Sequence, residues 1–277
     1  MHVRRRSRRN YSEVPGRLYA PDMIVGFAGS GNIAAAMARG WAAGDDGPEQ
    51  MLFTDSGSGR AAALAEEVGG EALDSNAELA ERAGLLVLAV KASALEGVAA
   101  EVQGAPAVLS LLAATPLDRV ANAFPDAAAF RVMPNLGVEL RHGVLCFAAG
   151  QGAGDQLVAE VRGSLELLGR LVEIDDGLFD AATAVMGCSP AYLALAMEAI
   201  AEAGAADGLD QQLAHSLVVD AAAGTVELLR ERHPADLRDA VASPGGSTEA
   251  GLDVLDREGV ADAFTEAVRA SLARMRG

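Results

Sequence analysis

Ile24-Val25-Gly26-Phe27-Ala28-Gly29-Ser30-Gly31-Asn32-Ile33-Ala34 joins a short apolar segment to an alanine-rich one through the spacing Gly29-x-Gly31-x-x-Ala34. This pattern predicts a strand, a tight glycine turn and a helix. The glycines let the backbone approach a pyrophosphate, whose charge meets free amides and the dipole at the helix N-terminus, and Ala34 lets the helix pack closely on the strand. We therefore predict dinucleotide binding here, the alternative being a purely structural glycine turn. The residues expected at the cofactor are Gly26, Ala28, Gly29, Ser30, Gly31, Asn32 and Ile33.

The chain around this turn alternates short apolar runs with amphipathic stretches as far as about Gly177. Such alternation is typical of βαβ units, and it predicts a Rossmann-type, doubly wound parallel sheet. The six expected strands are Met23–Phe27, Met51–Thr54, Leu85–Val90, Ala107–Leu112, Ala128–Val132 and Val144–Ala149. The expected helices between them are Gly31–Ala43, Arg60–Val68, Asn76–Arg82, Leu95–Val102, Pro116–Ala123 and Gly154–Leu168.

After Phe179 the strand signal ends and helical stretches rich in Ala and Leu run to the C-terminus. Two of them, Ala191–Ala205 and Gln211–Leu229, carry apolar residues on nearly every face. An isolated helical domain would leave much of that surface in water, so we expect burial against a second copy of the chain. The predicted organisation is an extension (1–22), a dinucleotide-binding domain (23–178) and an all-α domain for substrate binding and dimerisation (179–277).

Composition and charge narrow the class of protein. A chain of 277 residues with 51% hydrophobic residues can build real cores and is too apolar to be disordered. The net charge is −17 although six arginines and only two acidic residues fall in residues 1–22, so the rest of the chain is still more acidic. Such a surface disfavours binding to a nucleic-acid backbone. We expect residues 1–22, which precede Met23, to be a disordered basic extension; a nucleic-acid tail is the alternative.

Cysteine content and hydropathy point to the cytoplasm. Cys146 and Cys188 are too few for a metal cluster or a disulfide framework. No charge-free apolar run of about 18 residues occurs, as a membrane-spanning helix would need. We therefore expect a cytoplasmic protein without a metal or a membrane anchor.

Two further positions bear on the cofactor. The second strand leads into Asp55-Ser56-Gly57-Ser58-Gly59-Arg60, where the adenosine ribose is expected. A carboxylate there accepts from the ribose hydroxyls of NAD and repels the 2′-phosphate of NADP, whereas Thr54, Ser56, Ser58 and Arg60 could cradle that phosphate. Asp55 as a simple turn cap is a third interpretation. Lys91, the only lysine of the chain, closes a strand at the edge where doubly wound folds bind ligands, although a plain surface lysine is also possible.

Near the C-terminus, Ser243-Pro244-Gly245-Gly246-Ser247-Thr248 runs directly into a helical pattern. Two glycines and several hydroxyls at a helix start present backbone amides to an anion, which favours a carboxylate-binding loop. An ordinary capped turn is the alternative.

Taken together, these motifs resemble the pyrroline-5-carboxylate reductase family. The resemblance runs from Met23 to the C-terminus. It rests on Gly26-Phe27-x-Gly29-x-Gly31-Asn32, Ala89-Val90-Lys91, Arg131-Val132-Met133-Pro134-Asn135, Ser189-Pro190-Ala191-Tyr192, His233-Pro234-Ala235-Asp236-Leu237-Arg238 and Ser243 to Thr248. It implies NAD(P)H-dependent reduction of 1-pyrroline-5-carboxylate to proline, with NADPH slightly favoured, by a homodimer or larger homo-oligomer that binds neither nucleic acid nor membrane.

The resemblance also implies roles for individual residues. Thr248 would hydrogen-bond the ring nitrogen of the imine and is the expected catalytic residue. The expected substrate-binding residues are Ser243, Gly245, Gly246, Ser247, Thr248 and Glu231, with the substrate carboxylate on Ser243 and the amides of Gly246 and Ser247. The expected cofactor contacts beyond the glycine turn are Asp55, Ser56, Arg60, Asn76, Ala89, Val90, Lys91, Leu111, Ala113, Met133, Pro134 and Asn135. Orientation and a hydrogen bond to the forming amine are the main requirements of this chemistry, so no His or Glu acid is expected.

The chain departs from the family at active-site loops, namely at Ala92, Ser93, Leu136, Gly137, Cys188 and Ala240. These changes keep other functions open. An imine reductase for another cyclic imino acid and a nucleotide-binding regulatory paralogue are the two main alternatives. A β-hydroxyacid dehydrogenase would need a lysine on the first helix after the sheet, and residues 181–200 contain none.

Overall fold

The computed structural model describes residues 23–276, and the chain divides between Gly177 and Leu178 into two compact units. The predicted disordered extension, residues 1–22, lies outside the described residues.

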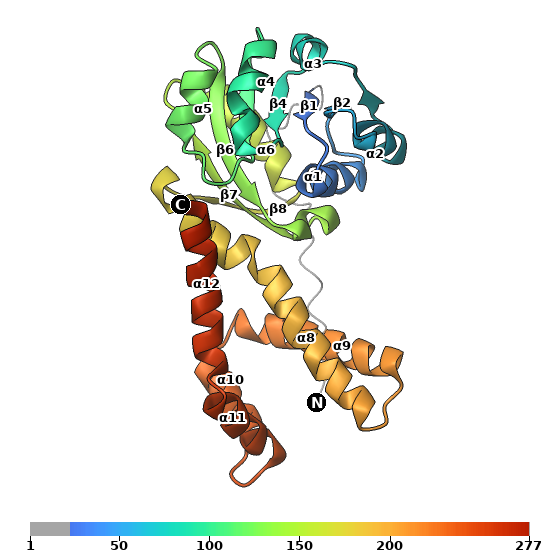
Figure 1. Cartoon of the computed structure of the whole chain (residues 1–277), viewed down its shortest axis with the longest axis vertical. Coiled ribbons are helices and arrows are strands. Elements are labelled where there is room, and N and C mark those ends of the chain that lie inside the picture. Colours follow the sequence, from blue (N-terminus) through green and yellow to red (C-terminus); the bar gives the residue numbers. More distant parts are fainter. Residues whose placement is uncertain (1–22, 277) are drawn as a thin grey trace, which may run out of the picture. The chain divides into compact units, whose positions relative to one another are not determined.

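An eight-stranded sheet in the order β3-β2-β1-β4-β5-β6-β7-β8 forms the centre of the first unit (Figure 1). All neighbouring strands are parallel except β6 and β7, which are antiparallel. The order reverses beside β1, so the predicted Rossmann-type, doubly wound fold is confirmed. The strands are β1 (Ile24–Ala28), β2 (Gln50–Thr54), β3 (Glu71–Ala72), β4 (Leu85–Leu88), β5 (Ala107–Ser110), β6 (Ala128–Pro134), β7 (Gly143–Ala149) and β8 (Gly169–Glu173).

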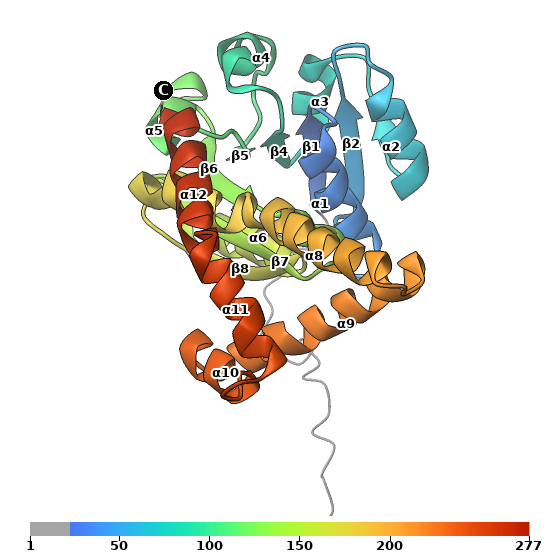
Figure 2. The ribbon, with the colours of Figure 1, turned by 60° about the horizontal axis from the view of Figure 1, so that its bottom comes forward.

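Helices cover both faces of this sheet (Figure 2). Val25 and Phe27 of β1 belong to one apolar core with residues of α1, α2 and α6. Gly26 points the other way, because neighbouring strand residues alternate between faces, and there it lies under Leu79 of α3. The helices of this unit are α1 (Asn32–Ala42), α2 (Arg60–Val68), α3 (Asn76–Arg82), α4 (Leu95–Glu101), α5 (Leu117–Ala123) and α6 (Asp155–Glu166), with 3-10 turns η1 (Ala92–Ala94), η2 (Leu136–Leu140) and η3 (Asp176–Leu178).

The prediction of six strands was wrong by two. β3 has two residues and one of them is a glutamate, so it carries no apolar signal. β8 is an edge strand without a fully buried residue, which hides the alternation expected of a strand. The expectation that all strands are parallel was also wrong. β6 and β7 are antiparallel, because the short turn η2 joins them and no crossover helix lies between them.

The second unit consists of helices and the turns and loops that connect them in its described residues. Its long helices α8 and α9 pack against each other as a pair (Figures 1 and 2). Yet Ala201 is the only buried residue of α8 and Ala214 the only one of α9. Leu193, Leu195 and Ile200 are among many exposed apolar side chains. The helices are α7 (Phe179–Ala182), the π-helical turn η4 (Thr183–Gly187), α8 (Ser189–Ala206), α9 (Gln211–Leu229), α10 (Pro234–Val241), α11 (Ser247–Arg257) and α12 (Val260–Arg276).

One helical run of the described chain, Asp176–Ala206, is long and apolar enough to cross a membrane by length and composition alone. Its most apolar window has a mean hydropathy of 1.4 and is 11% buried. The same exposed apolar character is what a helix at a subunit interface needs.

Candidate active site

The glycine turn after β1 has a geometry that requires glycine at its first position. Gly29 has a φ of +99°, and a Cβ there would lie 2.7 Å from the carbonyl oxygen of Ala89. Its amide donates to the carbonyl oxygen of Thr54 at 3.1 Å, and the buried Ser30 hydroxyl donates to the same oxygen at 3.0 Å. The turn is therefore fixed to the end of β2, and the Ser30 hydroxyl is committed to that contact.

The next glycine leaves room for a ligand. Gly31 is the N-cap of α1, with no side-chain cap, and a Cβ built on it meets no described atom within 4 Å. The amides of the first helical turn lack partners within the helix. The donors and the open space fit a pyrophosphate. Gly26 differs, because a Cβ there would lie 2.8 Å from the Leu79 side chain, so its absent side chain serves the packing of α3.

Asp55, at the end of β2, organises the loop that follows. Its Oδ1 accepts from the amides of Gly57 (2.7 Å) and Ser58 (2.9 Å), and its Oδ2 accepts from the amide of Ala61 (2.8 Å) and the hydroxyl of Ser58 (3.0 Å). The Ala61 amide, with help from the Ser58 hydroxyl and the other two amides, lowers the pKa of the Asp55 carboxyl to about 2. The Nε of Arg60 donates to the Ser58 hydroxyl oxygen at 3.1 Å. Ser56 and Arg60 are exposed beside this turn.

The end of β4 lies beside the glycine turn that follows β1. The amide of Ala89 donates to the carbonyl oxygen of Ala28 at 2.9 Å, and the Val90 side chain lies 3.1 Å from the Cβ position of Gly29. Lys91 is exposed and forms no ion pair with a described residue. The structure thus brings the glycine turn, the Asp55 loop and residues 89–91 to one edge of the sheet, where ligands bind in doubly wound folds.

Asn76 connects three elements at that edge. Its Oδ1 accepts from the Thr54 hydroxyl at 2.7 Å, and its Nδ2 donates to Glu101 Oε2 at 2.7 Å. The side chain is therefore engaged in joining β2, α3 and α4, and a cofactor contact by Asn76 stays a prediction.

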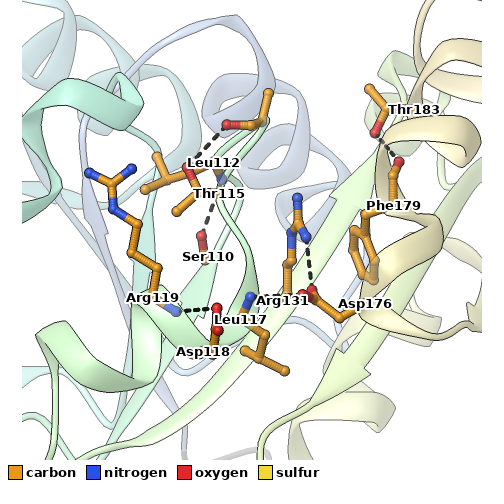
Figure 3. A network of polar contacts seen from close by, with 11 residues as sticks. Ser110, Leu112, Thr115, Leu117, Asp118, Arg119, Arg131, Asp176, Phe179 and Thr183 are labelled. Atoms are coloured by element: carbon orange, nitrogen blue, oxygen red, sulfur yellow. Dashed lines mark hydrogen bonds and ion pairs between the residues drawn. The ribbon is translucent and has the colours of Figure 1, made fainter. Parts of the chain in front are cut away.

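The turn after β5 contains strained backbone. The amide of Leu111 donates to the carbonyl oxygen of Leu88 at 3.0 Å, while Ala113 is exposed. Ala114 has a φ of +53°, a left-handed conformation that an alanine rarely adopts. The fully buried Thr115 donates to the carbonyl oxygen of Ala113 at 3.1 Å and holds this turn in shape (Figure 3). Strain of this kind is common where a backbone must be presented to a ligand.

The end of β6 is the last predicted cofactor segment. Met133 and Pro134 are buried, and Asn135 Oδ1 accepts from the Val144 amide at 3.1 Å. Earlier in β6, the buried Arg131 forms an ion pair with Asp176 (Figure 3). This pair was not predicted from the sequence. The available signal was the arginine itself, since a charge in a buried strand needs a carboxylate partner.

In the second unit, the predicted carboxylate loop begins α11. Gly245 has a φ of +72°, and its amide donates to Glu249 Oε2 at 2.7 Å. Gly246 is the N-cap, and its amide donates to the Ser243 carbonyl oxygen at 2.9 Å. The Gly246 amide is engaged in this contact, and substrate binding by it stays a prediction.

The donors left open in this loop lie one residue further on. Among the described residues, the amides of Ser247 and Thr248 have no acceptor, and the hydroxyls of Ser243, Ser247 and Thr248 have no partner. Thr248 stands in the first turn of α11 and not at its cap, so its hydroxyl is not a capping group. Glu231 is exposed just after α9, and a substrate contact there stays a prediction.

One departure from the family pattern falls on unusual backbone. Cys188 ends the π-helical turn η4, and its amide donates to the Thr183 carbonyl oxygen at 3.1 Å. The Thr183 hydroxyl donates to the carbonyl oxygen of Phe179 at 2.7 Å (Figure 3). Single π-helical turns occur frequently at functional sites.

Comparisons with known proteins agree with this geometry. Residues 24–114 match a family model described as NADP oxidoreductase, coenzyme F420-dependent, and residues 176–277 match one described as pyrroline-5-carboxylate reductase dimerisation. A pyrroline-5-carboxylate reductase of Synechocystis is 36% identical over 256 residues, covering 90% of this chain and 96% of the relative. One of Thermus thermophilus is 34% identical, covering 91% and 97%. The crystal structure of 1-pyrroline-5-carboxylate reductase from Streptococcus pyogenes superposes with a TM-score of 0.86 at 26% identity, covering 93% of this chain and 99% of that one.

A Rossmann-type sheet with an open glycine turn and a separate helical unit defines an NAD(P)H-dependent oxidoreductase. Within that class, the relatives decide the family. The chain belongs to the pyrroline-5-carboxylate reductase family, and its helical unit is that family's dimerisation domain.

Proposed function

We propose that the chain reduces 1-pyrroline-5-carboxylate to proline with NADPH as hydride donor. The observation that carries this proposal is the set of open donors at the start of α11, together with relatives that bear this activity in their names. The amides of Ser247 and Thr248 and the Ser243 hydroxyl suit the carboxylate of a small acid.

Thr248 has one of the two hydroxyls that remain open in the loop, the other being that of Ser247. With the carboxylate on the neighbouring amides, its hydroxyl lies within reach of the ring nitrogen of a five-membered imine. There it orients the C=N bond and gives the developing amine a hydrogen-bond partner. When bound, NADPH would supply the hydride for the imine carbon; the imine nitrogen, protonated from solvent to the iminium, would take up the C=N electron pair and become the neutral amine.

The cofactor is held, in this proposal, by the sheet edge of the first unit. The first-turn amides of α1 bind the pyrophosphate over Gly31, where no described atom fills the space. In this proposal Ala113 contacts the NADPH, the segment Met133 to Asn135 approaches the nicotinamide, and the exposed Lys91 supplies a positive charge just after β4.

We also propose that two copies join through α8 and α9, in the cytoplasm. Their exposed leucines and isoleucine support this, because apolar faces of that extent are stable only when covered. The apolar run Asp176–Ala206 then lies at a protein interface and not in a bilayer.

An assay with several cyclic imines tests the function. Purified protein is mixed with NADPH and either 1-pyrroline-5-carboxylate, its six-membered homologue or uncharged 1-pyrroline, and absorbance of the reduced nicotinamide is followed. We expect the highest kcat/KM with 1-pyrroline-5-carboxylate, because the α11 loop binds a carboxylate and a five-membered ring. Preference for the homologue would indicate another imino-acid reductase, and cofactor binding without any turnover would indicate a regulatory paralogue.

A further inference from the structure

Asp55 occupies the position at which a carboxylate ordinarily binds the adenosine ribose of NADH and repels the 2′-phosphate of NADPH. Here that carboxylate has no acceptor capacity left. Its two oxygens together receive four hydrogen bonds, from the amides of Gly57, Ser58 and Ala61 and from the Ser58 hydroxyl, at 2.7 to 3.0 Å. A carboxylate offers about four acceptor sites in all, so a ribose hydroxyl would have to displace one of these donors.

The loop held by this carboxylate presents cationic and hydroxyl donors. The Ser58 hydroxyl donates to Asp55 and accepts from Arg60 Nε at 3.1 Å, so the three side chains form a chain that fixes the guanidinium. No ion pair joins Arg60 to an acid among the described residues, and its terminal nitrogens remain available. Ser56 and Arg60 are both exposed at this turn. An arginine with free terminal nitrogens is well suited to a phosphate.

We infer that Asp55 is a positioning residue that makes the chain selective for NADPH, by holding the Ser56 to Arg60 loop so that Arg60 and the Ser56 hydroxyl receive the 2′-phosphate, while Ser58 joins Asp55 to Arg60. This inference rests on the proposed NADPH-dependent function. An acid at this position ordinarily disfavours NADPH, so its removal should strengthen NADPH binding. Here we expect the opposite, namely that removal of the Asp55 carboxylate weakens NADPH binding.

The test measures cofactor binding without substrate. Isothermal titration of the full chain with NADPH and with NADH gives the ratio of the two dissociation constants for the wild type and for Asp55→Asn, Ser58→Ala and Arg60→Ala. Glu66→Gln is the matched control, since Glu66 is an exposed acid on α2 and loses the same charge. Circular dichroism establishes that each variant is folded.

The wild type is expected to bind NADPH more tightly than NADH. Arg60→Ala should weaken NADPH binding by roughly ten- to a hundredfold and leave NADH binding nearly unchanged, as the loss of a charged hydrogen bond predicts. Asp55→Asn should lower the NADPH preference, because the amide NH₂ group cannot accept from the loop donors. Ser58→Ala should also lower the NADPH preference, although every hydrogen bond from a backbone amide to Asp55 remains. This variant tests the role of the loop even if Asp55→Asn does not fold. Glu66→Gln should leave the ratio unchanged.

Opposite results overturn the inference. If Asp55→Asn raised NADPH affinity relative to NADH, the carboxylate would be the usual repulsive ribose ligand. If Arg60→Ala left the ratio unchanged, the loop would not bind the 2′-phosphate. Because no imine is present, a protein that showed the expected ratios but reduced no imine would retain this inference and lose the proposed function.

Discussion

Arg131 Nη1 donates to Asp176 Oδ1 at 2.8 Å, and the arginine side chain is only 3% exposed (Figure 3). The second oxygen of Asp176 accepts from the amide of Leu117, the first residue of α5, at 3.0 Å. One carboxylate therefore joins β6, which ends in the predicted nicotinamide segment, to the start of the neighbouring helix. Asp176 also lies two residues before the boundary with the helical unit.

Replacement of this carboxylate should destabilise the protein strongly. Asp176→Ala removes the partner of a buried guanidinium and the acceptor of the Leu117 amide, so we expect a loss of about 3 kcal/mol in the free energy of unfolding. Urea denaturation at a fixed protein concentration measures it, because an oligomer's stability depends on concentration. Glu173→Ala, which removes a pair with Arg162 on the surface, is the control and should cost less than about 1 kcal/mol. Equal losses of unfolding free energy in the two variants would show that the buried pair stabilises the fold no more than the surface pair does.

Gly31 should tolerate substitution in folding but not in cofactor binding. Its φ of −80° is ordinary and its Cβ position is open, so Gly31→Asp should fold normally. The added carboxylate would repel the pyrophosphate, and we expect NADPH affinity to fall by at least about tenfold. Gly29→Ala, at a φ of +99°, should instead lower the melting temperature. A folded Gly31→Asp variant that bound NADPH as the wild type does would show that the pyrophosphate lies elsewhere.

Thr248→Ala should lower turnover without loss of stability. The hydroxyl has no partner among the described residues and is not a helix cap, so its removal should leave the melting temperature unchanged. Loss of its hydrogen bond to the imine nitrogen should cost about 1 to 3 kcal/mol in the transition state, roughly ten- to a hundredfold in kcat/KM. Thr248→Ser keeps the hydroxyl and should retain most of the activity. An unaltered kcat/KM in Thr248→Ala would remove Thr248 from the catalytic role.

Asp55 should also affect the acid stability of the fold. Hydrogen bonds hold its pKa at about 2, below the ordinary value of 3.8, so folding favours the ionised carboxylate. That contribution is complete above the unfolded pKa and is lost as the pH falls through the folded pKa. The difference in unfolding free energy between the wild type and Asp55→Asn should therefore shrink as the pH is lowered from about 5 to about 2. A constant difference over that interval, measured by urea titration, would contradict the hydrogen-bonded geometry of the loop.

Strong local signals made most of the fold predictable. The helices Arg60–Val68, Asn76–Arg82 and Gln211–Leu229 have the predicted bounds, because their apolar periodicity ends at clear breakers such as Gly69. β3 and β8 were missed because a strand's pairing partners, and not its own residues, decide whether it forms at a sheet edge.

The site was predictable in residue type more than in detail. Glycines and hydroxyls in the right order predicted the glycine turn after β1 and the loop before α11, both of which the structure contains. Which amides remain free depends on backbone geometry, so the commitment of the Gly246 amide to Ser243 was not visible in the sequence. The filled acceptors of Asp55 and the pairing of Arg131 with Asp176 likewise depend on distances in the folded chain.

Transfer of deuterium from labelled NADPH tests the central claim most directly. The protein is incubated with 1-pyrroline-5-carboxylate and NADPH that carries deuterium in both positions at C4 of the nicotinamide, so the face from which hydride leaves does not matter. Mass spectrometry of the product should show proline with a single deuterium at C5, the former imine carbon. Unlabelled proline, or labelled NADPH that is not consumed, would contradict hydride transfer to this imine.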